Sequence, residues 1–207
     1  LLGVSPNGID IDSFQSRNAA PTGERNGLLW LGRICEEKAP HLALDVAARA
    51  GLPITIAGQV YPFSYHQRYF EREIAPRLRQ MPEANFVSAP AFELKCNLLR
   101  RAQALLITSQ AEETSSLVAM EAAACGTPVI AFRRGALPEV VKDHVTGFVV
   151  DGLADAVEAC GQTRSISNAA CAAYARKNFG SAPMSDSYSR LYHRVTGRTS
   201  EFAATGD

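Results

Sequence analysis

The sequence lacks several features that would point at once to a class of protein. It has no excess of charge, since 21 basic residues balance 21 acidic ones, and it contains no block of five or more basic residues. We therefore expect no nucleic-acid partner. The longest apolar runs, such as GLLWLG and QALLIT, are too short to cross a bilayer. The first residues carry no basic stretch of the kind that opens a signal peptide.

Cofactor and metal motifs are also scarce. No GxGxxG follows an apolar strand pattern and no GxxxxGK[ST] occurs, which argues against a dinucleotide dehydrogenase and a P-loop NTPase. The five cysteines are odd in number and include no CxxC pair, so we interpret them as reduced core thiols of a cytosolic protein. The one Asp-x-Asp, at Asp10 and Asp12, is interpreted as a turn, and no metal site is predicted.

The 207 residues suffice for one sizeable hydrophobic core. The chain opens at Leu1 rather than at methionine, in what reads as the middle of a strand, so we expect a fragment of a longer protein. We divide it into a hinge strand and loop (1–20), a central α/β domain (21–152), C-terminal helices (153–196) and a flexible tail (197–207).

Short apolar runs alternate with amphipathic segments along most of the chain. Runs that are apolar throughout are typical of strands covered on both faces, and repeated strand-helix alternation predicts a parallel sheet with right-handed crossovers. The predicted fold class is therefore α/β, a Rossmann-like parallel sheet of about six strands flanked by helices. Strands are predicted at 27–32, 53–57, 84–88, 103–108, 128–132 and 146–150. Helices are predicted at 39–50, 65–80, 91–101, 116–125 and 137–142, and then at 153–162, 165–178 and 183–195.

Ligands of open α/β sheets bind at the carboxyl ends of the strands. Four predicted strands end in loops that carry charged residues or glycine, and these loops should share one rim of the sheet. Basic and acidic groups on one rim are the pattern expected for a ligand with both phosphates and hydroxyls. The rim residues are Arg33, Lys38, Glu113, Gly135 and Glu139.

The segment EETSSLVAMEAAACGTPVIA (112–131) places carboxylates on both sides of a predicted helix start. Ser115 or Ser116 can cap that helix, and its first amides favour an anion. Glu121 lies about 8 Å further along the axis than Glu113. Each carboxylate could accept hydrogen bonds from a different sugar ring. Glu113 could instead be a favourable charge near a helix start, and Glu121 an exposed mid-helix residue.

Two cations lie on the loop after the first strand. Arg33 offers a planar fork to phosphate oxygens and Lys38 a mobile point charge, while Gly32 allows a close backbone approach. The alternative is a pair of surface cations balanced by Glu36 and Glu37. Of the lesser candidates, His41 is interpreted as a cap or packing residue. The tyrosines at 61, 65 and 69, near His66, are interpreted as core packing.

Several ordered segments together resemble a known family. LGRICEEKAPHLAL, IAGQV and the stretch from EETSS to TGFVV (112–150) are similar to the C-terminal, donor-binding half of retaining GT-B glycosyltransferases of the family-four type. That signature has Gly-Arg with a Lys five residues after the Arg, a Glu-x7-Glu box, a GTPVIA segment and G-x-PE-x-V. The resemblance covers almost the whole chain.

The resemblance implies a role for each matching residue. Arg33 and Lys38 would hold the donor diphosphate, Glu113 would bind hydroxyls of the transferred sugar, and Glu121 would bind the ribose. No metal would be required, and the donor would be a UDP-sugar. The remaining donor contacts would come from the backbone of Ser115, Ser116, Leu117 and Val118 and from the glycines Gly32 and Gly58.

The acceptor implied by the resemblance is a glycan or lipid-linked sugar of polysaccharide assembly, bound by an N-terminal domain outside this sequence. We expect a cytoplasmic protein, with membrane contact only through that other half, and little transfer by this chain alone. The sequence departs from the family at Ser115-Ser116, where Phe-Gly is usual. A side chain at Ser116 could narrow the sugar pocket or donate a hydrogen bond.

Two other functions share this architecture. Nucleotide-sugar epimerases have the same fold but lack the Arg-to-Lys and Glu-x7-Glu set. A non-catalytic nucleotide-sugar-binding or interaction module is the third hypothesis, in which Ser115-Ser116 marks an altered pocket.

Overall fold

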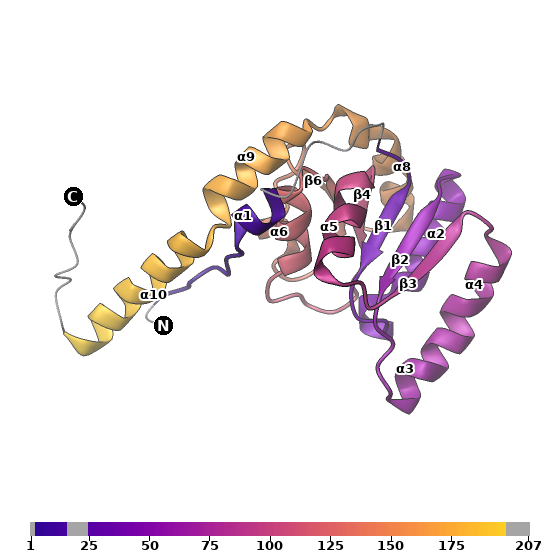
Figure 1. The fold of residues 1–207 in the computed structure, drawn as a ribbon, viewed down its shortest axis with the longest axis horizontal. Helices are drawn as coiled ribbons and strands as arrows, with labels where there is room; N and C mark the ends of the chain where they lie inside the picture. The colour runs from indigo at the N-terminus through magenta and orange to yellow at the C-terminus, as the bar shows by residue number, and fades with distance from the viewer. Residues whose placement is uncertain (1–2, 16–24, 198–207) are drawn as a thin grey trace.

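The computed structural model describes residues 3–15 and 25–197. The predicted boundary between the hinge and the binding domain, and almost all of the predicted tail, lie outside the described residues. Six parallel strands form a single sheet in the order β3-β2-β1-β4-β5-β6 (Figure 1). The predicted α/β class and parallel sheet are confirmed. The strands are β1 (Leu28–Leu31), β2 (Ile54–Gly58), β3 (Ala84–Ser88), β4 (Ala104–Ile107), β5 (Val129–Phe132) and β6 (Gly147–Val150).

Helices connect successive strands and cover both faces of the sheet (Figure 1). Between β1 and β5 they are the 3₁₀ turn Glu36–Lys38, α2 (Pro40–Ala50), α3 (Ser64–Tyr69), the π-helical turn Phe70–Ile74, α4 (Ala75–Gln80), α5 (Phe92–Arg101) and α6 (Leu117–Ala124). Later in the chain are α7 (Leu137–Val140), α8 (Leu153–Gln162), the 3₁₀ turn Thr163–Ser165, α9 (Asn168–Asn178) and α10 (Ser181–Thr196).

The predicted helix at 65–80 contains a π-helical turn, which the sequence analysis did not predict. Pro76 lies two residues after the end of this turn, in the first turn of α4. Proline has no amide hydrogen and its ring collides with the carbonyl four residues earlier, so a regular α-helix cannot pass through it unchanged. The wider turn accommodates that defect without ending the helical segment.

The apolar strands bury side chains on both faces. Leu29 and Leu105 belong to a cluster with residues of α5 and α6, whereas Trp30 and Ile56 belong to a second cluster with residues of α2 and α8. Side chains alternate between faces along a strand, so a run that is apolar throughout supplies both clusters. This explains why the predicted strands lack polar alternation.

All five cysteines are buried and free, as predicted. Burial raises the pKa of the Cys125 thiol to about 12, and the pKa of Cys160 and Cys171 to about 11. A thiol that stays protonated is a poor nucleophile and a poor metal ligand. These side chains therefore serve packing.

The first described segment contains no strand, in contrast to the predicted hinge strand. Two backbone contacts join it to the later helices: the amide of Ile9 donates to Phe179 O at 2.8 Å, and Ile9 forms a bridge with Gly180. The segment then forms α1 (Ile11–Gln15), a short helix not predicted from the sequence, which buries Ile11 and Phe14. It thus lies beside the junction of α9 and α10.

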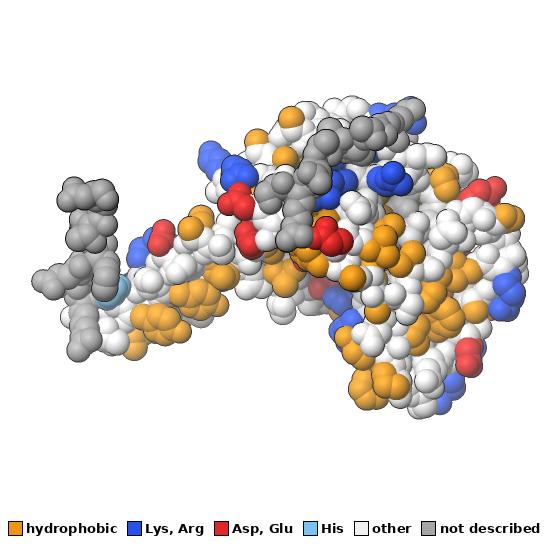
Figure 2. Space-filling model, viewed as in Figure 1, with side chains coloured by type: hydrophobic (Ala, Val, Ile, Leu, Met, Phe, Trp, Pro, Cys, Tyr) orange, Lys and Arg blue, Asp and Glu red, His pale blue; other side chains and the backbone are white. Residues whose placement is uncertain are grey.

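The helix α10 extends away from the sheet (Figure 1), and none of its residues is buried. Three large apolar side chains along it are exposed, namely Tyr188, Tyr192 and Val195. They recur at spacings of four and three residues and so share one side of the helix. Figure 2 shows apolar side chains gathered along this helix. None of the helices in the described ranges is long and apolar enough to span a membrane.

Candidate functional site

The strand order places a crevice at the carboxyl ends of β1 and β4. The chain proceeds from β1 outward to β2 and β3 on one side, then returns to β4 on the other side of β1. The connections leave these two neighbouring strands in opposite directions, which is where ligands of such sheets bind. The loops after β1 and β4, which hold Lys38 and Glu113, meet there.

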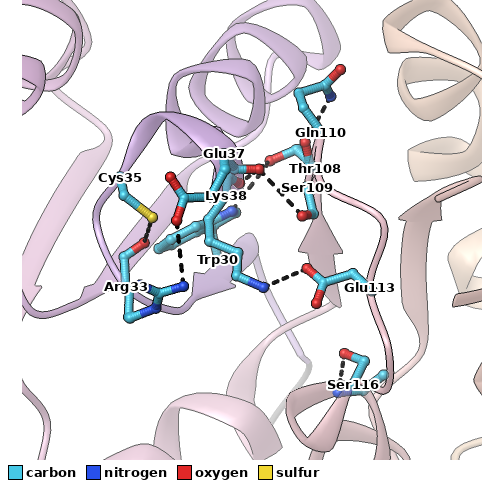
Figure 3. A network of polar contacts seen from close by, with 11 residues as sticks. Trp30, Arg33, Cys35, Glu37, Lys38, Thr108, Ser109, Gln110, Glu113 and Ser116 are labelled. Carbon is cyan, nitrogen blue, oxygen red and sulfur yellow. Dashed lines mark hydrogen bonds and ion pairs between the residues drawn. The ribbon is translucent and has the colours of Figure 1, made fainter. Parts of the chain in front are cut away.

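Hydrogen bonds fasten these two loops to each other. Thr108, just after β4, accepts a bond from Trp30 Nε1 at 3.2 Å and donates to Ala39 O at 2.8 Å. The amide of Gln110 donates to Glu37 O at 2.8 Å, and Ser109 donates to the same oxygen at 3.2 Å (Figure 3). The turn that ends at Lys38 is therefore held in place by the neighbouring loop.

The backbone at Ala39 directs the chain out of this turn. This buried residue has φ 48° and ψ 51°, a left-handed conformation that a residue with a side chain seldom adopts. It closes the 3₁₀ turn and immediately precedes Pro40, the first residue of α2, whose fixed φ suits a helix start. Such strain, of about 1–3 kcal/mol, persists only where the surroundings impose it.

Lys38 and Glu113 form an ion pair across the crevice. Lys38 Nζ lies 2.5 Å from Glu113 Oε1, and the two side chains are 27% and 12% exposed. Figure 3 shows them reaching toward each other from opposite loops. Two residues that the sequence placed 75 positions apart thus form one charged pair with limited access to water.

Arg33 lies on the same loop in a more open position. Its guanidinium is 3.4 Å from Glu37 Oε1, with the side chains 51% and 47% exposed. The sequence analysis gave an alternative in which both cations lie on the surface and pair with nearby glutamates. The structure shows this arrangement for Arg33 only. Lys38 instead faces the crevice.

The helix α6 begins at this crevice. Ser116 is its N-cap, with φ −136° and ψ 90°, and its hydroxyl accepts a bond from the amide of Ala119 at 3.4 Å. Of the two predicted caps, the structure therefore uses Ser116. The amides of Leu117 and Val118 have no helical carbonyl four residues before them, so they remain available to an anion.

The far end of α6 is fixed by a partly buried arginine. Arg25 donates to Cys125 O at 2.9 Å and to Thr127 Oγ1 at 2.6 Å. Desolvation by burial lowers the pKa of this guanidinium. Thr127 in turn donates to Leu99 O at 2.5 Å, which joins the end of α6 to α5. The C-terminal end of α6 is thereby fixed to α5 and to the segment before β1.

A cavity of about 170 Å³ lies where these elements meet. Seven of the ten predicted site residues line it: Gly32, Lys38, Glu113, Ser115, Ser116, Leu117 and Val118. The other lining residues belong to β1, to β4 and to the loop after β4, and they are Trp30, Leu31, Leu106, Ile107 and Ser109. The cavity thus has an apolar floor, a cation on one side and a helix start with a carboxylate on the other.

Three predicted site residues are not among those that line this cavity: Arg33, Gly58 and Glu121. A Cβ at Gly58 would lie 1.8 Å from Gly32 O. The structure therefore gives Gly58 a packing role, which is to let the ends of β1 and β2 approach each other. Its predicted contact with a ligand stays a prediction.

Glu121 lies one turn after Leu117 on α6, and its partner was not predicted. Lys95 Nζ of α5 is 2.7 Å from Glu121 Oε1. The sequence did indicate that a carboxylate among the apolar residues of this helix needs a partner. It could not identify Lys95, because the partner depends on how α5 packs against α6.

Glu112 is a further residue that the sequence analysis missed. Its carboxylate accepts from the amide of Gly135 at 2.7 Å, and Ala136 N donates to Glu113 O at 2.6 Å. Gly135 has φ 51°, and a Cβ there would lie 2.2 Å from Glu113 O. The loop after β5 thus holds the backbone that presents Glu113, and it does so only because residue 135 is glycine.

The aromatic segment after β2 is only partly core. Tyr69 is buried and its hydroxyl lies 2.6 Å from His41 Nδ1, while burial lowers the pKa of His41. This supports the packing interpretation of both residues. Tyr65, in contrast, is exposed and stacks on exposed Phe63 with ring centroids 5.7 Å apart. Its predicted core position is wrong, because the buried side of helix α3 carries His66 and Tyr69 and leaves Tyr65 outside.

The fold and the site together define a class: an α/β domain whose ligand site lies at the carboxyl ends of a parallel sheet, beside a helix start. Comparison with protein families makes the class definite. The model of the glycosyl transferases group 1 family matches residues 12–177. The chain belongs to this family, and its sheet and helices are those of the C-terminal domain of a GT-B, family-four type glycosyltransferase.

Curated relatives include D-inositol 3-phosphate glycosyltransferases. The protein of Mycolicibacterium smegmatis is 36% identical over 154 residues, which are 70% of this chain and 35% of the relative. The protein of Geodermatophilus obscurus is 33% identical over 172 residues, which are 72% of this chain and 36% of the relative. The chain therefore spans about a third of the length of these relatives.

Solved structures show the same fold. The avilamycin A biosynthesis glycosyltransferase AviGT4 matches with a TM-score of 0.76 and 21% identity, over 95% of this chain and 58% of that one. Anabaena Alr3699/HepE in complex with UDP matches with a TM-score of 0.76 and 20% identity, over 90% of this chain and 56% of that one. At such identity the likeness concerns the fold alone.

Proposed function

We propose that this chain is the donor-binding half of a retaining hexosyltransferase that uses a nucleotide sugar, with a UDP-sugar as donor. The observation that carries the proposal is the convergence of Lys38, Glu113 and the first turn of α6 on one cavity. A nucleoside diphosphate sugar needs a positive environment for its diphosphate and acceptors for its hydroxyls. These three elements provide both.

In this proposal Lys38 and the free amides of Leu117 and Val118 bind the diphosphate. When the bond between the sugar C1 and the diphosphate oxygen breaks, the electron pair stays on that oxygen. A fixed ammonium and a helix start stabilise this developing charge without rearranging. Arg33, on the exposed part of the same loop, provides a second cation for the diphosphate. No metal ion is required in this proposal.

Glu113 is assigned to hydroxyls of the transferred hexose. Its Oε1 is engaged by Lys38, which leaves Oε2 and further lone pairs for the sugar. The carboxylate would then contact both parts of the site. It binds Lys38, which holds the diphosphate, and it binds the hexose that is transferred. Glu121, one turn further along α6, is assigned to the ribose.

A cavity of about 170 Å³ is smaller than the roughly 300–1,000 Å³ of a site that encloses a whole ligand. It can receive only part of a sugar nucleotide. We therefore propose that an N-terminal acceptor-binding domain completes the site from the other side and binds a glycan or lipid-linked acceptor. The exposed apolar side chains of α10 are a surface that such a domain could cover.

The UDP assignment is supported by the complex of Anabaena Alr3699/HepE with UDP. Retention of configuration and the hexose are proposals that follow from the family resemblance. Transfer requires that the acceptor hydroxyl bonds to C1 and loses its proton, and the residues that receive that proton are expected in the acceptor-binding domain.

The proposal is tested by calorimetric titration with UDP and with UDP-glucose, UDP-galactose and UDP-N-acetylglucosamine. We expect one of the UDP-sugars to bind more tightly than UDP. In Glu113→Gln this preference should be lost, because the neutral amide forms weaker bonds to the sugar hydroxyls. Binding of UDP itself should not weaken, since Lys38 is then free of its carboxylate partner.

Glu158→Gln provides the matched control, since Glu158 is an exposed carboxylate of α8 and is not among the residues that line the cavity. It should leave the preference for the sugar intact. A Glu113→Gln protein that retains the full preference would contradict the assignment of Glu113. A wild-type chain that binds neither UDP nor any UDP-sugar would contradict the proposed function itself.

A further inference from the structure

A second ion pair lies beside the site, one turn along α6. Lys95 Nζ is 2.7 Å from Glu121 Oε1, and the side chains are 22% and 15% exposed. The two residues come from neighbouring helices, α5 and α6. Glu121 follows Met120 and precedes Ala122, both buried, so the carboxylate sits at the edge of the core with limited access to water.

The ammonium of Lys95 is held by more than this carboxylate. It lies 5.2 Å from the ring centroid of Phe14 and 5.4 Å from that of Phe92. The two rings touch each other edge to face, with centroids 5.2 Å apart. A cation at this distance from aromatic faces is attracted by them. Groups from α1, α5 and α6 thus fix the position of a single ammonium.

We propose that Lys95 is a positioning residue for donor recognition: it orients the carboxylate of Glu121 toward the ribose diol of the nucleotide. This inference rests on the proposed function, in which Glu121 binds the ribose. An ionised carboxylate has about four acceptor positions. Lys95 occupies one of them on Oε1, and the remaining positions suffice for two vicinal hydroxyls.

The geometry argues that the pair does more than stabilise the fold. A glutamate side chain on the edge of a helix can usually adopt several rotamers, and in many of them the carboxylate points into solvent. Lys95 draws Oε1 toward α5, and the two rings prevent the ammonium from following the carboxylate elsewhere. Removing Lys95 would leave Glu121 in place on the helix but would release its orientation. Recognition of the ribose should suffer more than stability.

This distinction is testable with a nucleotide that lacks one hydroxyl. Calorimetric titrations would compare UDP with 2′-deoxyuridine diphosphate on the wild-type chain, on Lys95→Met and on Lys95→Arg. If GDP or ADP binds more tightly than UDP, that nucleotide and its 2′-deoxy form take their place. The matched control is Lys177→Met, which removes an exposed lysine of α9.

The wild-type chain should prefer the ribonucleotide by at least about tenfold, as a hydrogen bond to a charged group permits. In Lys95→Met this preference should fall to about twofold or less. Lys95→Arg, which keeps the cation, and Lys177→Met should retain it. Phe92→Leu, which keeps the ion pair but removes one ring beside the ammonium, should give an intermediate preference.

The outcomes separate this inference from the proposed function. A wild-type chain that binds no nucleoside diphosphate overturns both. A wild-type chain that binds UDP but does not distinguish the 2′-deoxy form overturns the assignment of Glu121 to the ribose and with it the role of Lys95, while the diphosphate site stands. A Lys95→Met protein that keeps the full preference overturns the role of Lys95 alone. Thermal unfolding monitors whether each variant is folded. If Lys95→Met does not fold, Phe92→Leu decides, and an unchanged preference in that variant overturns the role.

Discussion

At the scale of single residues, Ser116 shows how the chain accommodates a departure from its family. The family usually has glycine at this position, but the backbone here, at φ −136°, is one that any residue adopts. The side chain lies at the cavity and also caps α6. The side chain of Ser116 therefore occupies space at the cavity that a glycine would leave open.

Replacement of Ser116 tests the capping role. Ser116→Ala should lower the free energy of unfolding by about 1 kcal/mol, because the amide of Ala119 loses its acceptor. Ser116→Gly should lower it by only a few tenths of a kcal/mol. Urea denaturation at constant pH measures both. Ser167→Ala is the matched control, since Ser167 caps α9 in the same way away from the site.

Equal destabilisation by Ser116→Ala and Ser167→Ala is the expected outcome, since the two side chains form the same bond. A Ser116→Ala protein as stable as the wild type would show that the hydroxyl does not cap the helix. It would then be free to contact a ligand.

Some residues of the site could be predicted from the sequence and others could not. Lys38, Glu113 and the start of α6 could be found from the sequence because each lies at a fixed offset from a strand end. Lys95 and Glu112 could not, since their partners are set by helix packing and by the path of the loop after β5. Arg33 was predicted beside Lys38 from spacing, but spacing cannot show that Arg33 turns to Glu37 and the solvent.

At the scale of secondary structure, the close approach of β1 and β2 depends on Gly58. Gly58→Ala should lower the free energy of unfolding by about 1–3 kcal/mol, because the new Cβ would lie 1.8 Å from the backbone oxygen of Gly32, which has little room to move. Gly152→Ala is the control, since no atom lies within 4 Å of its Cβ and its φ is −173°. That change should remain within about 0.5 kcal/mol.

Urea denaturation of the two variants measures the difference. A Gly58→Ala protein no less stable than Gly152→Ala would mean that the ends of β1 and β2 are free to separate. In that case the floor of the crevice would not be rigid, and Gly58 would have to be explained by contact with a ligand instead.

The elements themselves were largely predictable. All six strands follow from short runs rich in apolar residues, because five of the strands are mostly buried. The edge strand β3 is the exception, since none of its residues is buried. The features missed were those without periodicity: α1 has five residues, the 3₁₀ turn that ends at Lys38 has three, and the π-helical turn arises from the local effect of Pro76. The direction of α10 was not predictable either, because it depends on contacts at Gly180.

At the scale of the whole molecule, the buried thiols make stability depend on pH. Their pKa is raised in the folded chain, to about 12 for Cys125 and about 11 for Cys160 and Cys171, against an ordinary value of 9.0. Above pH 9 the unfolded chain releases these protons while the folded chain retains them. The contribution of these thiols to the free energy of unfolding should therefore be fully present below pH 9. It should be lost as the pH rises from 9 toward 12.

The decline is at most about 1.4 kcal/mol per pH unit for each thiol. Urea denaturation under reducing conditions at pH 8, 9, 10 and 11 would follow it. A variant in which Cys125, Cys160 and Cys171 are all replaced by alanine should show a shallower decline, because other groups that titrate in this range are unchanged. Parallel curves for the two proteins would contradict the assignment to the thiols.

The central claim is that Lys38 and the start of α6 bind the diphosphate of a nucleotide, and titration calorimetry with UDP in the presence of EDTA tests it most directly. The wild-type chain should bind one UDP without metal, and Lys38→Ala should bind it at least about tenfold more weakly, since a charged hydrogen bond contributes about 1.5–3 kcal/mol. Lys177→Ala should bind as the wild type does. Equal binding by wild type and Lys38→Ala, or binding that EDTA abolishes, would contradict the account.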